Sequence, residues 1–401
     1  MKSSFIYVDA GMGHYVPAKA LYDRFIEKGY EATLDNFFLD ILDSKKWNSI
    51  VKESWKKQLK HPKLERIENT ILDNSYNFYL IRFLAKHKKL AQSNFKRWIE
   101  KEKPDFLFCT NYLVAPIVTT MLNMNNINIP LFVLGTDIFD NQKIGVSNLI
   151  DVQYMPSELG VKNYIRHGFD PSIVKVSPFP LKKGMEFYYN YTKEEARLEL
   201  ALNLNKPTIT LNLGGEGIGN TKFIKALAKM DIDWQVIILG GMSEKTKLDV
   251  EKFRLRYPSF SLITPGFVDN IGLYIKACDA QVGKTGGNSF LESLYLKRPF
   301  FITEILYISK AYIEFMKEYK VGWANNNTKK QIDILKQYFK NKDQQDEMSN
   351  VLNNLPINFR INDFVDLIIS DYKRFNTTEK LLEKRKIIKQ NIKKNHHLKN
   401  R

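Results

Sequence analysis

The chain has 401 residues, which is long enough for two domains that each bury a hydrophobic core. Its hydrophobic content of 44% is typical of a soluble globular protein, and no apolar run approaches the ~20 residues that a membrane-spanning helix needs. The formal net charge of +17 indicates an acidic partner surface, for which nucleic acid and anionic lipid are both candidates.

The first segment is predicted to be a strand over residues 4–10 followed by a helix over residues 17–28. Its beginning is too brief, and too acidic at its end, for a signal peptide. Gly11 and Gly13 in the connection match the start of a dinucleotide-binding fingerprint, but a valine stands at the third glycine position, which weakens that interpretation. His14 follows the first strand, where α/β sheets place their ligands, so a catalytic role and a structural role both stay open.

Residues 45–66 form a strongly basic segment with eight Lys or Arg against two glutamates. Apolar residues recur in it at four-residue spacing, which predicts an amphipathic helix suited to a membrane interface. The predicted membrane-binding residues are Trp47, Val51, Trp55, Lys56 and Lys57.

A second patch over residues 78–98 interleaves aromatic and basic side chains. Either patch alone is explained by an ordinary helix with a solvated basic face. Because the two are adjacent, and because no signature of a nucleic-acid-binding module is present, we expect an anionic membrane surface and no nucleic acid.

Regular α/β alternation follows, with strands predicted at 105–110, 131–135 and 151–155. A helix is predicted over 157–167, with a serine at its start and a glycine after its end. Asp137 comes directly after one of these strands. It is a candidate for orienting or assisting His14, although a capping role in the next turn is equally compatible with the sequence.

A proline-rich linker precedes a second run of strand and helix patterns, with strands predicted at 207–213, 234–240, 260–264, 279–283 and 299–303. The predicted organisation is an N-terminal domain, 1–181, and a C-terminal domain, 185–357, with a ligand cleft between them. The helix predicted within 358–376 is long enough to pack back on the first domain, and 377–401 form a basic tail. Both cysteines, Cys109 and Cys278, lie in apolar strand patterns, which predicts buried, reduced thiols in a cytoplasmic protein.

Two glycine-rich loops in the second domain each lie between a predicted strand and a predicted helix. Each alone is explained as a tight connection, but two such loops indicate a diphosphate held between them by backbone N–H groups at helix starts. Glu292, about one turn into its helix, could reach a hydroxyl beside that anion. The loop residues are Gly214, Gly215, Glu216, Gly217, Ile218 and Gly219 in the first loop, and Gly283, Lys284, Thr285, Gly286, Gly287, Asn288 and Ser289 in the second.

No catalytic metal is predicted. The second loop ends like a phosphate-binding Walker A loop, but Cys278 stands where its upstream glycine is required. The only histidine pair with ligand-like spacing is His396 and His397, in the tail.

Residues 4–325 resemble glycosyltransferase family 28, in its branch of monogalactosyl- and glucosyl-diacylglycerol synthases. The resemblance rests on the first loop with His14, on the Thr136 and Asp137 element, and on both later glycine loops. Phe267 and Val268 stand where the family's backbone contacts uracil. The chain departs from the family over residues 305–310, which read Ile-Leu-Tyr-Ile-Ser-Lys where the family usually carries a Pro-Gly-Gln-Glu element whose Gln-Glu pair binds the sugar hydroxyls. It also lacks a histidine and a tryptophan after Asp137.

The resemblance implies a GT-B fold of two Rossmann-like, doubly wound domains and an inverting, metal-independent transfer from a UDP-hexose to a lipid hydroxyl, diacylglycerol or a glycosyl-diacylglycerol. It implies His14 as the base, with Asp137 as its orienter or rival. Gly217, Gly286, Gly287 and Asn288 would hold the diphosphate, and Glu292 the ribose. The expected location is the cytoplasmic face of the cell membrane, as a peripheral protein.

Two alternatives stay open. One is a UDP-N-acetylglucosamine transferase acting on a polyprenyl-linked precursor, which shares the fold and the donor site. The other is a nucleotide-sugar-binding homologue with impaired catalysis, which the missing Gln-Glu pair would permit.

Overall fold

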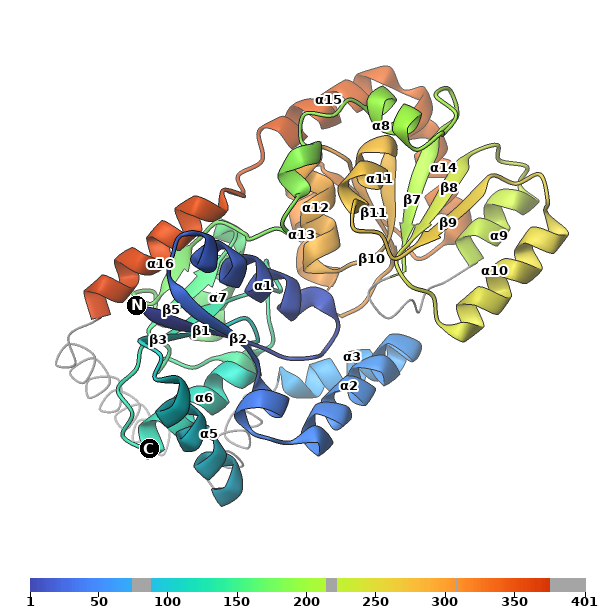
Figure 1. Cartoon of the computed structure of the whole chain (residues 1–401). Helices are drawn as coiled ribbons and strands as arrows, with labels where there is room; N and C mark the ends of the chain where they lie inside the picture. The colour runs from blue at the N-terminus through green and yellow to red at the C-terminus, as the bar shows by residue number, and fades with distance from the viewer. Residues whose placement is uncertain (74–87, 214–221, 308, 376–401) are drawn as a thin grey trace, which may run out of the picture. The chain divides into compact units, whose positions relative to one another are not determined.

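The computed structural model describes residues 1–73, 88–213, 222–307 and 309–375 (Figure 1). The chain divides into two compact units. The N-terminal unit contains residues 1–55, 67–180 and the chain from 357 onward, and the C-terminal unit contains 56–66 and 181–356. These divisions fall within a few residues of the predicted boundaries, except that 56–66 groups with the C-terminal unit.

The described residues of the N-terminal unit form a six-stranded parallel sheet in the order β2-β1-β3-β4-β5-β6. The strands are β1 (Lys2–Tyr7), β2 (Glu31–Asn36), β3 (Phe106–Cys109), β4 (Leu131–Leu134), β5 (Val152–Met155) and β6 (Val174–Val176). The helices are α1 (Met12–Glu27), α5 (Lys89–Glu102), α6 (Val114–Met124), α7 (Glu158–His167) and α16 (Ile361–Phe375), with a π-helical turn at Phe37–Ile41. The helices α2 (Lys45–Lys60) and α3 (Pro62–Leu72) are divided between the two units.

Both faces of this sheet are buried. Alternate residues of a strand point to opposite faces, and the β3 sequence Phe-Leu-Phe-Cys therefore sends its two phenylalanines to one side. That side is covered by α1 and α16 around Leu21, Phe25 and Phe364. The other side is covered by α5, α6 and α7. Helices on both faces make this a doubly wound layer structure.

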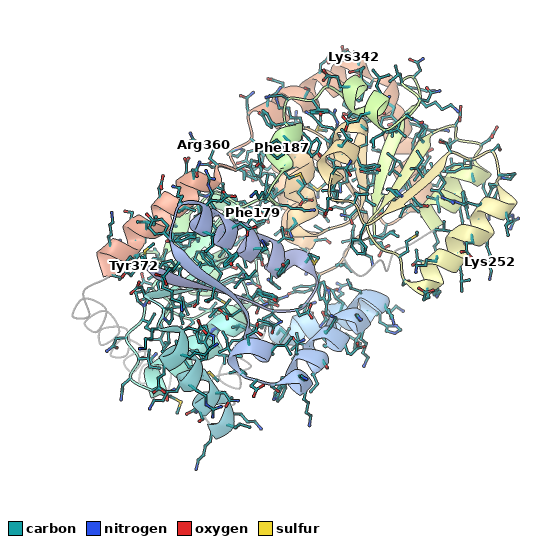
Figure 2. The ribbon with its side chains drawn as sticks, viewed as in Figure 1. Phe179, Phe187, Lys252, Lys342, Arg360 and Tyr372 are labelled. Atoms are coloured by element: carbon teal, nitrogen blue, oxygen red, sulfur yellow. The ribbon has the colours of Figure 1, made fainter. Side chains whose placement is uncertain are left out.

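Helix α16 completes the N-terminal unit although it lies at the far end of the chain. Its Tyr372 ring is 5.6 Å from the Phe106 ring (Figure 2). Its buried Asp371 accepts a hydrogen bond of 2.9 Å from the Tyr154 hydroxyl and pairs with Lys175. The helix occupies residues 361–375, as its apolar periodicity predicts.

The described residues of the C-terminal unit form a second six-stranded parallel sheet, in the order β12-β11-β10-β7-β8-β9. The strands are β7 (Thr208–Asn212), β8 (Gln235–Leu239), β9 (Leu262–Gly266), β10 (Ala280–Lys284), β11 (Phe300–Glu304) and β12 (Gly322–Ala324). The helices are α8 (Lys193–Glu199), α9 (Lys222–Lys229), α10 (Glu244–Arg256), α11 (Ile271–Ala277), α12 (Gly287–Tyr295), α13 (Ser309–Tyr319), α14 (Thr328–Lys340) and α15 (Lys342–Asn353).

Each sheet has a topological switch point, where the order of its strands reverses. In the N-terminal unit the reversal lies between β1 and β3, and in the C-terminal unit it lies between β7 and β10. Ligands of open α/β sheets bind at the carboxyl ends of the strands at such points. The fold therefore assigns one candidate position to each unit.

Most local differences from the prediction have simple causes. Helix α1 begins at Met12, five residues before the predicted start, so His14 lies in its first turn. The basic segment forms two helices, α2 and α3, where one was expected. The edge strands β2 and β12 were not predicted, because an edge strand that is only half buried carries no continuous apolar run.

Candidate functional site

His14 lies at the switch point of the N-terminal sheet, held by residues that follow its strands. Its Nδ1 is 2.8 Å from the backbone oxygen of Thr110, which follows β3, and 2.9 Å from the hydroxyl of Thr136, which follows β4. The Thr110 hydroxyl in turn donates to the His14 carbonyl at 2.8 Å. Hydrogen bonds therefore hold both the ring and the backbone carbonyl of His14.

These contacts assign the protonation state of His14. A carbonyl oxygen only accepts hydrogen bonds, so Nδ1 carries the proton and Nε2 keeps its lone pair. Burial lowers the pKa of His14 to about 4, and the hydrogen bond to Thr110 opposes this shift. At neutral pH the ring is uncharged, with Nε2 as an acceptor. This is the state that a general base requires.

Asp137 lies next to Thr136 at the same edge of the sheet. Burial, and then the charge of Asp140, raise the pKa of Asp137 to about 6. Among the described residues no hydrogen bond joins Asp137 to His14, since Nδ1 is taken by Thr110 and Thr136. The contact that orients His14 is thus made by the backbone carbonyl of Thr110, which sequence reasoning did not single out. Asp137 is a carboxyl group whose pKa lies close to neutral pH.

The glycine loop before His14 is covered by helix α2. Gly11 has φ of 74°, and a Cβ at this position would come within 2.9 Å of the Trp55 indole nitrogen. On the same helix Lys52 pairs with Asp9 at 3.0 Å. Gly13 has no neighbour within 4 Å of an added Cβ, so the structure gives no steric reason for its glycine.

The side chains of the predicted membrane helix divide between two environments. Trp47 and Ile50 are 47% and 45% exposed. Val51 instead packs against the core of the N-terminal unit, and Trp55 lies on Gly11. Lys56 is half-buried and Lys57 is exposed. Within the described part of the chain, no helix is long and apolar enough to cross a membrane.

The second candidate position is the switch point of the C-terminal sheet, where β10 lies beside β7. Gly283 has φ of 150°, and a Cβ there would lie 2.3 Å from the Asn212 backbone oxygen, so only glycine allows this strand contact. The first glycine loop, with Gly214, Gly215, Glu216 and Gly217, follows β7 but lies outside the described residues.

The second glycine loop begins helix α12. Gly286 is the N-cap and Gly287 the first helical residue, and no side chain caps this end. The loop therefore presents helix-start N–H groups, which favour an anion. Asn288 and Ser289 continue the first turn, and the Ser289 hydroxyl donates to the Gly286 oxygen at 3.2 Å.

Three charged side chains accompany this helix start. Lys284, with its side chain 7% exposed, lies 3.5 Å from Glu304. Burial lowers the pKa of Lys284, and Glu304 opposes the shift. Glu292 is 6% exposed, and burial raises its pKa to about 7, against the effect of Lys182. Burial thus shifts Lys284 and Glu292 towards neutrality, as is common in ligand sites.

Phe267 and Val268 follow β9 in the same unit. The Phe267 ring is 79% exposed and lies against Gly241, where an added Cβ would come within 2.5 Å of it. An exposed aromatic ring that rests on a glycine backbone provides a flat surface on which a nucleobase can stack.

The segment that departs from the family is ordered by polar contacts of its own. The Thr285 hydroxyl lies 2.9 Å from the Ser309 hydroxyl, which is fully buried. The Tyr307 backbone N–H donates to the Glu65 carboxylate at 3.1 Å. Sequence reasoning missed Glu65, because a single acidic residue in a basic segment gives no signal. Among the described residues no group of three or more His, Cys, Asp or Glu could hold a metal ion.

Comparisons with known proteins agree with this geometry. Residues 14–181 match the family model described as monogalactosyldiacylglycerol (MGDG) synthase. A processive diacylglycerol beta-glucosyltransferase of Bacillus pumilus is 24% identical over 301 residues, which cover 72% of this chain and 73% of that protein. A probable chloroplastic monogalactosyldiacylglycerol synthase 3 of Oryza sativa subsp. japonica is 24% identical over 325 residues, which cover 74% of this chain and 60% of that protein.

Solved structures share the fold at low sequence identity. The MnaA protein of S. aureus, in a co-structure with UDP, aligns with a TM-score of 0.60 at 11% identity and covers 93% of this chain and 96% of its own. MurG of Acinetobacter baumannii aligns with a TM-score of 0.59 at 12% identity, covering 92% and 99%.

Two doubly wound units of this topology, matched along most of their length by these structures, define a protein of the GT-B class, and the predicted fold class is confirmed. The family model over residues 14–181 and the relatives then show that the chain is similar to the branch of diacylglycerol glycosyltransferases and MGDG synthases. The resemblance inferred from the motifs is confirmed with it.

Proposed function

We propose that this protein transfers a hexose from a UDP-sugar to the hydroxyl group of a membrane lipid, diacylglycerol or a glycosyl-diacylglycerol. The names of the relatives from Bacillus and rice support the substrate class. The observation that carries the proposal is the neutral His14, which is fixed through Nδ1 at the sheet switch point and keeps Nε2 as an acceptor.

In the proposed reaction a base removes the proton of the lipid hydroxyl. The oxygen attacks the anomeric carbon of the donor from the face opposite UDP, and the bond to the diphosphate breaks with its electron pair going to UDP. The configuration at the anomeric carbon is thereby inverted. We assign the role of the base to His14, acting through Nε2, with Asp137 as the rival. Both residues lie at the same edge of the N-terminal sheet, and the pKa of each is shifted from its ordinary value.

The donor is assigned to the C-terminal unit. The uncapped start of α12 at Gly286 and Gly287 offers backbone N–H groups to the diphosphate, and these would stabilise the charge of the departing UDP without a metal. Glu292 is assigned to the ribose hydroxyls and the exposed Phe267 ring to the uracil.

The membrane surface is assigned to the exposed part of helix α2. Trp47 and Ile50 are apolar and exposed on a helix that carries six lysines and one glutamate. Such a helix binds anionic headgroups by its charge, with ~1 kcal/mol for each lysine near the surface, and inserts its exposed rings at the interface. We place the protein at the cytoplasmic face of the membrane.

The first test is a transfer assay. The protein is incubated with UDP-glucose, UDP-galactose or UDP-N-acetylglucosamine and with vesicles that contain either diacylglycerol or a polyprenyl phospholipid. Transfer of glucose or galactose to diacylglycerol is the expected result. Transfer of N-acetylglucosamine only to a polyprenyl phospholipid would support the alternative acceptor, and the absence of transfer to any lipid would overturn the enzyme assignment.

The second test separates the base from the scaffold. His14→Ala is expected to lower kcat by roughly 10²–10⁴-fold, the usual contribution of a general base. The matched control is His61→Ala, which removes an exposed histidine and should leave turnover unchanged. Full activity of His14→Ala would refute the assignment of His14.

A further inference from the structure

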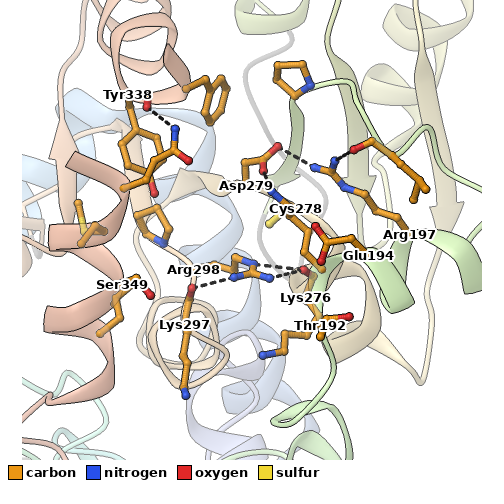
Figure 3. Close-up of a pocket in the computed structure, with 18 of the residues that line it drawn as sticks. Thr192, Glu194, Arg197, Lys276, Cys278, Asp279, Lys297, Arg298, Tyr338 and Ser349 are labelled. Carbon is orange, nitrogen blue, oxygen red and sulfur yellow. Dashed lines mark hydrogen bonds and ion pairs between the residues drawn. The ribbon is translucent and has the colours of Figure 1, made fainter. Parts of the chain in front are cut away.

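A cavity lies in the C-terminal unit, at the opposite edge of its sheet from Gly286 and Gly287. It has a volume of about 640 Å³ and is lined by the residues that immediately precede β7, β10 and β11, among them Lys206, Asp279 and Arg298 (Figure 3). Because the strands are parallel, this is the amino-terminal edge of the sheet. The proposed reaction uses no residue of this cavity.

The lining of the cavity carries an excess of positive charge. Seven lysines and arginines face three carboxylates, and Lys206 also pairs at 2.7 Å with Asp233 outside the lining, which leaves three positive charges in excess. The cations are Lys193, Arg197, Lys206, Lys276, Lys297, Arg298 and Lys342, and the carboxylates are Glu194, Asp279 and Asp346.

Two of the carboxylates are occupied by other cations of the lining. Asp279 accepts from Lys193 at 2.8 Å and from Arg197 at 2.7 Å, and Asp346 pairs with Lys342 at 2.8 Å. Within the described ranges, none of the three neighbouring cations Lys276, Lys297 and Arg298 has a carboxylate partner within 4.0 Å. These three cations, which we name the basic triad, line the cavity, and Asp279 acts on Arg298 as an opposing charge without pairing with it.

The basic triad retains donors for a ligand. Arg298 uses three of its five N–H groups on backbone oxygens, two bonds going to the Lys276 oxygen at 2.7 and 3.1 Å and one to the Lys297 oxygen at 3.1 Å. Lys276 uses one of its three on the Tyr189 oxygen at 2.8 Å. The Lys297 ammonium lies over the Tyr189 ring, 4.7 Å from its centre.

Burial is the main cause of the lowered pKa at Lys276 and Arg298, and repulsion from the neighbouring cations adds to it at Lys276. Burial, then Arg298 and then Lys297, lower the pKa of Lys276 to about 8. Burial also lowers the pKa of Arg298. An anion among these groups would offset the repulsion between them and favour their protonated forms.

A purely structural role explains only part of this arrangement. Arg298 and Arg197 donate to the last carbonyls of α11, at Lys276 and Ala277, and so neutralise the negative end of that helix. This accounts for the two arginines. It does not account for Lys276 and Lys297, whose ammonium groups contact no α11 carbonyl in the described structure and add charge to a site that the arginines already neutralise.

We propose that the cavity binds a phosphate-bearing anion, whose oxygens accept hydrogen bonds from Lys276, Lys297 and the remaining N–H groups of Arg298. Cationic donors that converge in a partly enclosed cavity recognise the charge and the several acceptor oxygens of a phosphate group. The anion is either a free phosphate or diphosphate compound or the phosphomonoester headgroup of a lipid, and the chemistry of recognition is the same for both.

Calorimetric titration of the full chain with pyrophosphate, in the presence of saturating UDP, tests the free ligand. Flotation with phosphatidylcholine vesicles, with and without a phosphomonoester lipid, tests the headgroup. Lys297→Gln removes one charged hydrogen bond and should weaken binding roughly tenfold, while Lys297→Arg should retain it. The matched control is Lys252→Gln, which removes an exposed charge from α10 (Figure 2) and should change affinity less than about twofold.

Loss of pyrophosphate binding in Lys297→Gln, with an unchanged melting temperature, would support a free ligand, and the same loss confined to vesicles would support a headgroup. The proposal is overturned if neither probe binds, or if Lys297→Gln binds as wild type does. These outcomes are independent of the proposed transferase activity, because the UDP site is titrated separately with the same variants.

Discussion

The pH dependence of turnover distinguishes the two candidate bases at the edge of the N-terminal sheet. A base acts in its deprotonated form, so activity falls as the pH drops through its pKa. The pKa is about 4 for His14 and about 6 for Asp137. Their difference corresponds to roughly 2.7 kcal/mol of protonation free energy.

The difference is large enough to measure near pH 5. With a pKa of about 4, roughly 90% of His14 is neutral at that pH, so an enzyme that uses His14 retains nearly its full rate. With a pKa of about 6, only roughly 10% of Asp137 is ionised there, so an enzyme that uses Asp137 loses about nine tenths of its rate.

The assay is kcat/KM for the UDP-sugar between about pH 4.5 and 8, at saturating lipid, with tryptophan fluorescence as the control for folding at each pH. We expect a nearly constant rate down to about pH 5 in wild type and in Asp137→Asn, if the latter is active. A decline centred near pH 6 that disappears in Asp137→Asn would refute His14 as the base and assign Asp137. A decline that persists in Asp137→Asn would refute both assignments.

Further predictions concern stability and surface binding. Asp137→Asn should stabilise the protein by about 1–2 kcal/mol at pH 7.5 and not at pH 4, and urea unfolding at both pH values checks this. The reason is that the raised pKa of the Asp137 carboxyl favours the folded wild-type protein at low pH, and this contribution is lost as the pH rises through about 6. Gly283→Ala should lower the melting temperature by several degrees through the clash with the Asn212 oxygen. Gly286→Ala, with φ of −154° and only an ordinary contact of 3.6 Å to the Ser289 hydroxyl, should leave the melting temperature unchanged and weaken UDP binding; equal melting temperatures in both variants would contradict the Gly283 contact. Trp47→Gln should weaken binding to anionic vesicles in a flotation assay without changing turnover of a soluble acceptor, and unchanged flotation would exclude Trp47 from the membrane contact.

The sequence predicted the parallel sheets well because their central strands are continuous apolar runs bounded by turn residues. Strands β7, β8, β10 and β11 each lie within one or two residues of the predicted range. The cap at Ser157 and the left-handed Gly168 at the end of α7 were also predicted from residue type. The fold could be recognised from the sequence because the glycine positions mark strand-to-helix turns.

The sequence predicted the candidate site only in part. It identified His14 and the α12 loop, because a histidine or a pair of glycines that follows a predicted strand can be recognised from the sequence alone. It did not identify the Thr110 carbonyl that fixes the His14 tautomer, because every residue has a carbonyl and only the register of β1 against β3 selects this one. The sequence also did not show that Val51 and Trp55 pack against the protein, because helical periodicity identifies an apolar stripe but not the surface that the stripe contacts.

The order in which the ribosome delivers the chain has a consequence for the first unit. Phe364, Val365 and Ile368 line the same core as Phe106 and Phe108, and Asp371 satisfies the buried Tyr154 hydroxyl. During synthesis this core stays open until α16 has emerged, long after the residues of the second unit are available to fold. A premature stop codon after residue 357 would therefore damage the half of the enzyme that was translated first.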